Sequence, residues 1–170
     1  MWKKKGLIYS CDFYETGYAQ DPFIDMLDDR TWRIYYSART KDVVSYPYYV
    51  DVEAGNPHNI LNIHNRPLFQ VGRIGTFDDS GITMTSIVKV EDKKYLYYCG
   101  WNRKVSVPYA LSIGLAVVKN NNSLFEKMFE GPILDRSKDN PIAVSAPCVI
   151  VEEGTFKMWY ISFTEWKAYD

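Results

Sequence analysis

Acidic residues stand where short apolar segments begin, and they are the first candidates for chemistry in this chain. Asp78 and Asp79 open a turn that leads into a β-branched run over residues 82–90, and Asp21 stands directly before Pro22 at the start of another apolar segment. Carboxylates gathered at strand ends can take up and release protons during a reaction. The same residue types also form ordinary turns, and Pro is tolerated at the first position of a strand, so both interpretations stay open at this point.

The elements that must position these acids recur at a fixed interval. Three aromatic segments, 34–38, 96–100 and 158–162, align without gaps, and the central residues Tyr35, Tyr97 and Trp159 are equally spaced (97 − 35 = 62 and 159 − 97 = 62). A shorter apolar segment precedes each of them. A repeat of this size in a strand-like pattern is typical of propeller blades, whereas helical repeats have shorter periods.

We therefore predict an all-β fold, a β-propeller built from four-stranded antiparallel blades. The whole chain, 1–170, is expected to be one partial propeller domain. Dividing 170 by 62 gives about 2.7 blades, and closed propellers generally need at least about four. We expect either a fragment whose C-terminal half is missing or self-association that covers the open sheet edge. The expected parts are an N-terminal segment (1–19), blade 1 (20–77), blade 2 (78–141) and a partial blade 3 (142–170).

The pattern also predicts individual strands. In the first unit it predicts strands over 22–26, 32–39 and 45–52, a fourth strand near 67–69, and a stray N-terminal strand around 6–10. In the second unit it predicts strands over 83–90, 95–101, 109–118 and 124–134. The third unit is expected to run from 143 to 163.

Composition excludes several function classes. The formal net charge is −1 and no basic stripe is present, which argues against nucleic acid as a partner. No segment is long enough to be a signal-peptide core or to cross a membrane, so we expect a cytoplasmic protein with no membrane partner. His58 and His64 have no metal-like companions and no nucleotide-binding glycine loop is found, so we expect neither a metal nor a cofactor. The three cysteines, Cys11, Cys99 and Cys148, are an odd number, and Cys99 and Cys148 fall within predicted strands, so we expect small buried apolar side chains rather than disulfides or metal ligands.

The chain resembles the five-bladed β-propeller glycosidase superfamily, which includes arabinanases, β-xylosidases and invertases. The resemblance is closest to an intracellular subgroup that we associate with polysaccharide-related genes, and it implies that this chain is about the N-terminal half of a five-bladed protein. It extends over nearly the whole chain and is carried by Tyr18–Pro22, Trp32–Arg39, Phe77–Ile82, Leu96–Trp101, Ile113–Ala116, Glu130–Leu134 and Met158–Ser162.

The resemblance implies three acids at the inner ends of the first three blades. Cleavage of a glycosidic bond needs one ionised carboxylate and one protonated carboxyl beside the sugar. Asp21 matches the first position, the base or nucleophile. Asp79 is the best match for the second, orienting position, although Thr83 lies nearer to the usual placement. The third position departs from the pattern, because Ser145 stands where a Glu is expected, and Glu165 is the expected substitute acid.

Other residues are expected to line the funnel and bind substrate: Arg39, Trp101, Asp78 and Ser145. Buried packing is the competing interpretation for Trp101, and an ion pair with an Asp is the competing interpretation for Arg39. Asp21 and Asp79 are expected to lie at one funnel face with Ser145 nearby. The acids expected to lie in peripheral turns instead are Glu91, Asp92, Glu152 and Glu153.

We therefore expect a glycosidase-like protein that acts on, or binds, a carbohydrate in the propeller funnel. The alternatives are a non-catalytic carbohydrate-binding or protein-interaction propeller that lacks the third acid, and an inactive truncated fragment.

Overall fold

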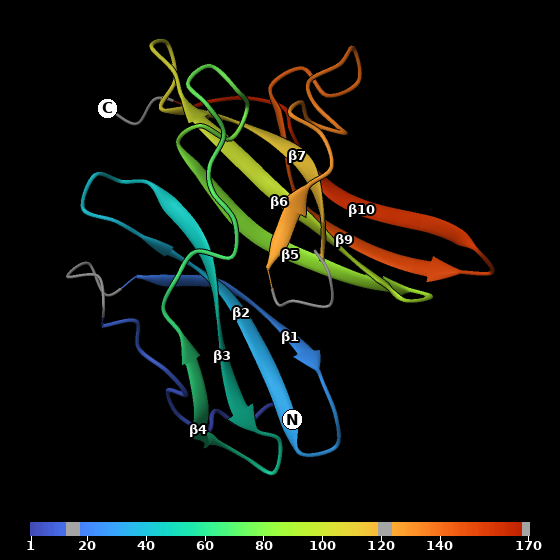
Figure 1. Cartoon of the computed structure of the whole chain (residues 1–170). Coiled ribbons are helices and arrows are strands. Elements are labelled where there is room, and N and C mark those ends of the chain that lie inside the picture. The colour runs from blue at the N-terminus through green and yellow to red at the C-terminus, as the bar shows by residue number, and fades with distance from the viewer. Residues whose placement is uncertain (13–17, 119–123, 168–170) are drawn as a thin grey trace.

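The structure is a computed structural model that describes residues 1–12, 18–118 and 124–167. Over these residues it is all-β, as predicted, and contains no helix (Figure 1). Consequently, the described part of the chain holds no helix that could cross a membrane. The ten strands are β1 (Ala19–Met26), β2 (Thr31–Arg39), β3 (Ser45–Glu53), β4 (Asn56–His64), β5 (Gly81–Val90), β6 (Lys93–Arg103), β7 (Tyr109–Val118), β8 (Phe125–Lys127), β9 (Ala143–Glu152) and β10 (Thr155–Phe163).

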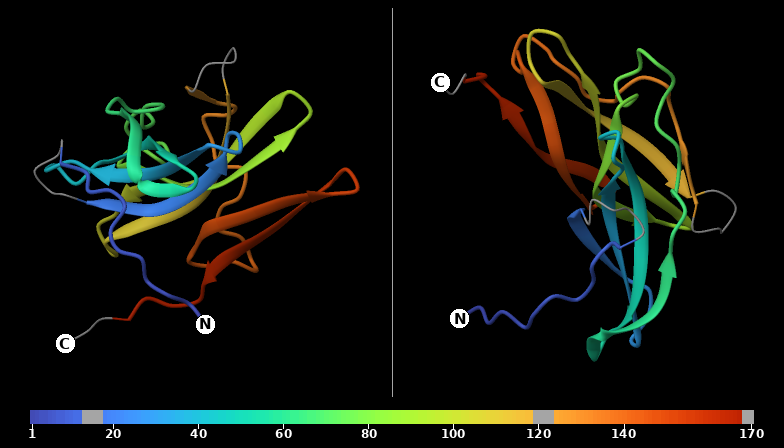
Figure 2. Two further views of the ribbon diagram at one scale, coloured as in Figure 1. Left: turned by 90° about the horizontal axis from the view of Figure 1, so that it is seen from below. Right: turned by 90° about the vertical axis from the view of Figure 1, so that its left-hand side faces the viewer.

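The strands form two four-stranded antiparallel blades and a third hairpin. Blade 1 is β1–β2–β3–β4 and blade 2 is β5–β6–β7–β8, and among the described residues a single parallel pairing, Ser45 with Gly81, joins their ladders. The β9–β10 hairpin packs beside blade 2, against β5, β6 and β7 (Figures 1 and 2). The aromatic strands β2, β6 and β10 begin at equal intervals (93 − 31 = 62 and 155 − 93 = 62). This arrangement confirms the partial propeller predicted from the repeat.

Some of the predicted strand positions were wrong. The fourth strand of blade 1 is β4 rather than residues 67–69, and His58 and His64 lie on this strand. β4 is an edge strand with mostly exposed residues, so it lacks the alternation that marks a half-buried strand. β8 has only three residues, and residues 6–10 form no strand.

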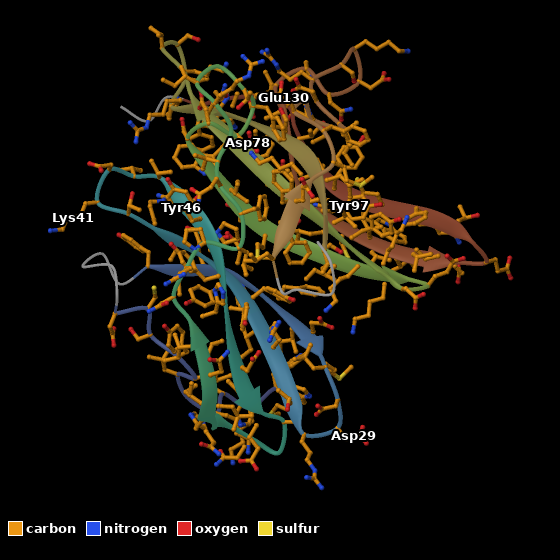
Figure 3. All side chains as sticks on the ribbon, in the orientation of Figure 1. Asp29, Lys41, Tyr46, Asp78, Tyr97 and Glu130 are labelled. Carbon is orange, nitrogen blue, oxygen red and sulfur yellow. The ribbon has the colours of Figure 1, made fainter. Side chains whose placement is uncertain are left out.

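The doubled aromatic residues of the central strands pack against different neighbours. Successive residues of a strand point to opposite faces of the sheet. Tyr35 and Tyr98 therefore belong to one core cluster between blades 1 and 2, whereas Tyr97 packs with Val149 between blade 2 and β9. Figure 3 labels Tyr97 on the side of blade 2 that faces the β9–β10 hairpin. Tyr36 lies on the outer face of blade 1, which the N-terminal segment covers. The aromatic strands β2 and β6 thus each pack against neighbours on both faces.

Hydrogen bonds between blades follow the same period. The Ser37 hydroxyl accepts a hydrogen bond from the backbone N–H of Met84, at 3.0 Å. Sixty-two residues later along both strands (37 + 62 = 99 and 84 + 62 = 146), the Cys99 thiol accepts one from the N–H of Ala146. Burial raises the pKa of the Cys99 thiol to about 12, so this sulfur stays a neutral structural group.

The prediction that the cysteines are buried holds for Cys11 and Cys99 but is wrong for Cys148. All three are free. Cys148 lies on a face of the β9–β10 hairpin that no other described element covers, and it is exposed there.

A charged cluster also joins blades 1 and 2. Asp25 on β1 is 8% exposed and pairs with Lys94 at 2.5 Å and with Lys89 at 3.0 Å, both from blade 2. Burial alone would raise the pKa of Asp25, but the hydrogen bonds and charges of the two lysines outweigh it, and the pKa lies below its ordinary value. The folded state therefore stabilises the ionised carboxylate.

Replacing Asp25 with Asn should destabilise the protein at neutral pH. Removing one partner leaves Lys94 partly buried without its counter-charge, and we expect a loss of about 2–3 kcal/mol in the free energy of unfolding, less than for a fully buried pair because Lys89 is half-exposed. A group with a lowered folded pKa stabilises above its unfolded pKa, near pH 4, and this contribution disappears as the pH falls through the folded pKa. Urea denaturation should therefore show that the difference in free energy of unfolding between the wild type and Asp25→Asn is smaller at pH 2 than at pH 7.

Asp29→Asn is the matched control, because Asp29 is exposed in the β1–β2 turn (Figure 3). A loss of stability by Asp25→Asn that is equal at both pH values would contradict the electrostatic role of this cluster.

Several apolar side chains of β10 are exposed to solvent. Trp159 is 58% exposed, although its counterparts Tyr35 and Tyr97 are 1% and 8% exposed because a following blade covers them. Ile161, which points to the same face of β10 as Trp159, is also exposed. An exposed apolar surface of this kind on an edge sheet is typical of an interface with another sheet.

The 170-residue chain should accordingly self-associate through β10. Sedimentation velocity should show dimers or larger species at micromolar concentration, and Trp159→Lys should shift the distribution toward monomer. Trp2→Lys, at an exposed Trp of the N-terminal segment, should have no such effect. A wild-type chain that sediments as a monomer at all concentrations would contradict this expectation.

Candidate active site

A cavity of about 510 Å³ lies where the starts of the inner strands meet the ends of the aromatic strands. Its volume falls within the range common for small-molecule sites, about 300–1,000 Å³. Three predicted site residues, Asp21, Arg39 and Trp101, line it together. The remaining lining residues are Gln20, Val43, Thr83, Arg103, Pro108, Tyr109 and Leu111.

A β-bulge directs Asp21 into this cavity. The pairing of β1 with β2 passes from Gln20–Ser37 to Phe23–Tyr35, so that Asp21 and its neighbour Pro22 together oppose one residue. Asp21 has a φ of 52°, in the left-handed region that Asp and Asn tolerate better than most residues. The bulge removes this acid from the ladder and re-aims its side chain.

The environment of Asp21 shifts its titration. Burial raises the pKa of the Asp21 carboxyl, and the nearby Arg39 charge lowers it only in part, so the net shift is upward. The residue nevertheless keeps a solvent-exposed surface. An accessible carboxyl with a raised pKa in a cavity is a typical feature of groups that exchange protons with a ligand.

Trp101 forms a fixed wall of the cavity. Its indole N–H donates to the Ser45 hydroxyl at 2.9 Å, and that hydroxyl donates to the Ile82 carbonyl at 3.1 Å. Gly81 makes this contact possible, because a Cβ there would lie 2.2 Å from the indole nitrogen. Arg39 lies over the ring, 5.7 Å from its centroid, and Trp101 is only 7% exposed. The packing interpretation of Trp101 is thus correct, and the residue still borders the cavity.

Arg103 is a cavity residue that the sequence analysis missed. Its guanidinium donates to the carbonyls of Asp42 and Val43, in the loop between β2 and β3. It thereby ties that loop of blade 1 to β6 of blade 2. The signal for it was slight, because a single Arg after an aromatic strand is typical of many exposed strand ends.

Asp79 does not line the cavity. Its carboxylate accepts a hydrogen bond from the Gly75 backbone N–H at 2.8 Å and one from the Ser80 hydroxyl at 2.7 Å. These bonds stabilise the turn before β5. In this structure the acidic turn therefore has the ordinary structural role that its composition also allowed.

Asp78 lies in the interior and lines a different cavity, of about 440 Å³. It is 1% exposed, pairs with Lys127 at 2.5 Å, and accepts hydrogen bonds from the Tyr98 and Thr76 hydroxyls, both at 3.1 Å. Figure 3 shows it on the side of blade 2 that carries Glu130, another lining residue of that cavity. Its bonding groups are satisfied within the protein, which indicates a structural ion pair.

The third-blade positions bring no acid to the Asp21 cavity. Ala146 precedes Pro147 in a β9 bulge with a φ of 48°, which makes it the structural counterpart of Asp21. Ser145 is buried and pairs with Ile161, the register that Gln20 has in blade 1.

Glu165 lines a neighbouring cavity and pairs with Lys167 at 2.9 Å. Of the carboxylates in the described residues, only Asp21 therefore lines the central cavity.

The acids expected in peripheral turns are found there: Glu91 and Asp92 lie at the β5–β6 turn, and Glu152 and Glu153 at the β9–β10 turn. The described residues contain no group of three or more His, Cys, Asp or Glu side chains that could hold a metal ion. What the site offers is a single carboxyl, two guanidinium groups and an aromatic wall.

The raised pKa of Asp21 makes a prediction about stability. A raised folded pKa means that ionisation disfavours the folded state, a cost that is absent below the unfolded pKa near pH 4 and grows as the pH rises through the folded pKa. Asp21→Asn, which keeps a residue suited to a φ of 52°, should be at least as stable as the wild type at pH 7. In thermal unfolding, any gain in stability of Asp21→Asn over the wild type at pH 7 should become smaller at pH 3. A variant that is clearly less stable at pH 7 would show that Asp21 is a structural residue.

Comparison with known proteins agrees with this architecture. No family model matches the chain. Uncharacterized proteins from two strains of Mycobacterium tuberculosis, CDC 1551 and H37Rv, are each 33% identical over 168 residues, which is 97% of this chain and 56% of the relative. The chain thus spans about half the length of these curated relatives.

Two solved structures share its fold. One is a thermostable family-43 glycoside hydrolase, with a TM-score of 0.55, 16% identity, and coverage of 88% of this chain and 60% of that one. The other is a candidate glycoside hydrolase from Parabacteroides distasonis, with a TM-score of 0.51, 13% identity, and coverage of 85% and 64%. Over the part that it spans, the chain has the all-β propeller fold of these glycoside hydrolases.

Proposed function

We propose that this chain supplies the first part of a carbohydrate-active propeller, in which the Asp21 cavity binds a sugar and Asp21 acts on the glycosidic bond. The observation that carries the proposal is the placement of Asp21: an accessible carboxyl with a raised pKa, aimed by a bulge into a cavity of about 510 Å³. The shared fold with glycoside hydrolases supports a carbohydrate as the ligand.

The cavity residues have groups suited to a sugar. The Asp21 carboxylate accepts hydrogen bonds from hydroxyls, and the guanidinium groups of Arg39 and Arg103 donate them. Tyr109 adds an apolar ring with a hydroxyl. In the proposed reaction, ionised Asp21 either takes a proton from the water that attacks the sugar carbon or attacks that carbon itself as a nucleophile, the two roles that the resemblance implies for it.

A second carboxyl is needed to protonate the leaving oxygen. Of the described residues that line the cavity, only Asp21 carries a carboxylate, so we propose that the general acid comes from a part of the protein beyond this chain. The length of the relatives leaves room for it: 168/0.56 gives about 300 residues, or about 4.8 repeats of 62. In this proposal Asp79 stabilises a turn and takes no part in the reaction.

A second candidate function is carbohydrate binding without catalysis. It is favoured by the third-blade positions, where Ser145 and Ala146 stand in place of a proton donor. In this case the cavity would retain sugar affinity and show no turnover.

Asp21→Asn, made in a protein of the relatives' length, tests the proposal. Turnover of aryl glycosides and oligosaccharides should fall by about 10²–10⁴-fold, because a positioned acid–base group contributes about that factor. Asp79→Asn should retain turnover, since its carboxylate serves the turn before β5.

Full activity of Asp21→Asn would contradict the proposed catalytic role of Asp21. An unmodified protein that binds sugar without turnover would establish the second candidate instead.

A further inference from the structure

We infer that the site takes an oligosaccharide rather than a single sugar, and that the chain crosses from the Asp21 cavity over Tyr109 to Trp166. This inference rests on the proposed carbohydrate function. Its basis is a second cavity, of about 860 Å³, that adjoins the first.

The two cavities share a rim. Pro108, in the loop between β6 and β7, lines both of them. Tyr109, which follows it, lines the first cavity, and its ring contacts that of Trp166 in the second, with centroids 5.2 Å apart. A ligand longer than the first cavity would therefore meet Tyr109 and then Trp166 as it leaves.

Three aromatic rings form a continuous path along this route. Trp101 and Tyr109 lie 6.5 Å apart at an interplanar angle of 68°, and Tyr109 and Trp166 meet at 80°. Tyr109 is 37% exposed, so part of its ring stays accessible despite these contacts. Trp101, buried at the inner end, is the fixed wall, whereas Tyr109 and Trp166 can offer apolar surface to successive sugar rings.

The outer cavity also has polar groups at its edge. Glu165 and Lys167 flank Trp166, pair with each other at 2.9 Å, and are both largely exposed. An exposed pair of this kind contributes little to stability, so its groups are free to exchange partners with hydroxyls. We therefore assign Glu165 to binding at the far end of the ligand and not to proton transfer at Asp21.

The test is the dependence of affinity on ligand length. Calorimetry of the 170-residue chain would use matched mono-, di-, tri- and tetrasaccharides of arabinose, xylose, mannose and glucose. In the series that binds, affinity should rise at least about 10-fold from mono- to tetrasaccharide. Trp166→Ala should remove about that factor for the tetrasaccharide and leave the monosaccharide unchanged. Trp2→Ala is the matched control, because Trp2 is exposed and lines neither cavity.

Glu165→Gln is a milder second variant, and it should weaken the tetrasaccharide alone, by a few-fold. Equal affinities for all lengths, or equal losses for mono- and tetrasaccharide in Trp166→Ala, would overturn the extended site while leaving sugar binding at Asp21 intact. Absence of binding across the whole panel would overturn both proposals.

Discussion

The structure depends on hydrogen bonds in which side chains of one blade bind backbone N–H groups of the next blade. The inner strands leave the ladder at bulges, and the freed backbone N–H groups of Met84 and Ala146 are bound by side chains of the preceding blade, Ser37 and Cys99. A buried N–H without a partner is costly, so these contacts fix how neighbouring blades sit against each other. The same bulge geometry in blade 1 aims Asp21 into the cavity. The candidate site is therefore a consequence of how the blades are joined.

Much of the fold could be predicted because aromatic residues recur at equivalent positions of its repeat. Tyr35, Tyr97 and Trp159 occupy equivalent positions on β2, β6 and β10, and equal spacing of large side chains is visible without any structure. The edge strand β4 could not be predicted from pattern, since one of its faces meets solvent and its few apolar residues show no alternation. Cys148 was misjudged for a related reason: strand position alone does not say whether another sheet covers the residue.

The site was less predictable than the fold. Asp21 was indicated by its place beside Pro22, and Arg39 and Trp101 by their place at the ends of equivalent strands (101 − 39 = 62). Asp78 and Asp79 have the same composition signal whether they bind a ligand, hold a buried lysine or stabilise a turn, and only the partners Lys127 and Gly75 distinguish these cases. Arg103 is the last residue of β6 and Tyr109 the first residue of β7, and whether such strand ends reach the cavity depends on tertiary contacts that sequence spacing does not show.

The central claim is that the cavity beside Asp21 is a sugar site. The most direct measurement is a crystal structure of the chain soaked with the tightest-binding oligosaccharide. The account predicts density for a sugar ring with a hydroxyl within about 2.6–3.2 Å of the Asp21 carboxylate, and further rings toward Tyr109. A sugar bound elsewhere, with the Asp21 cavity filled only by solvent, would contradict it.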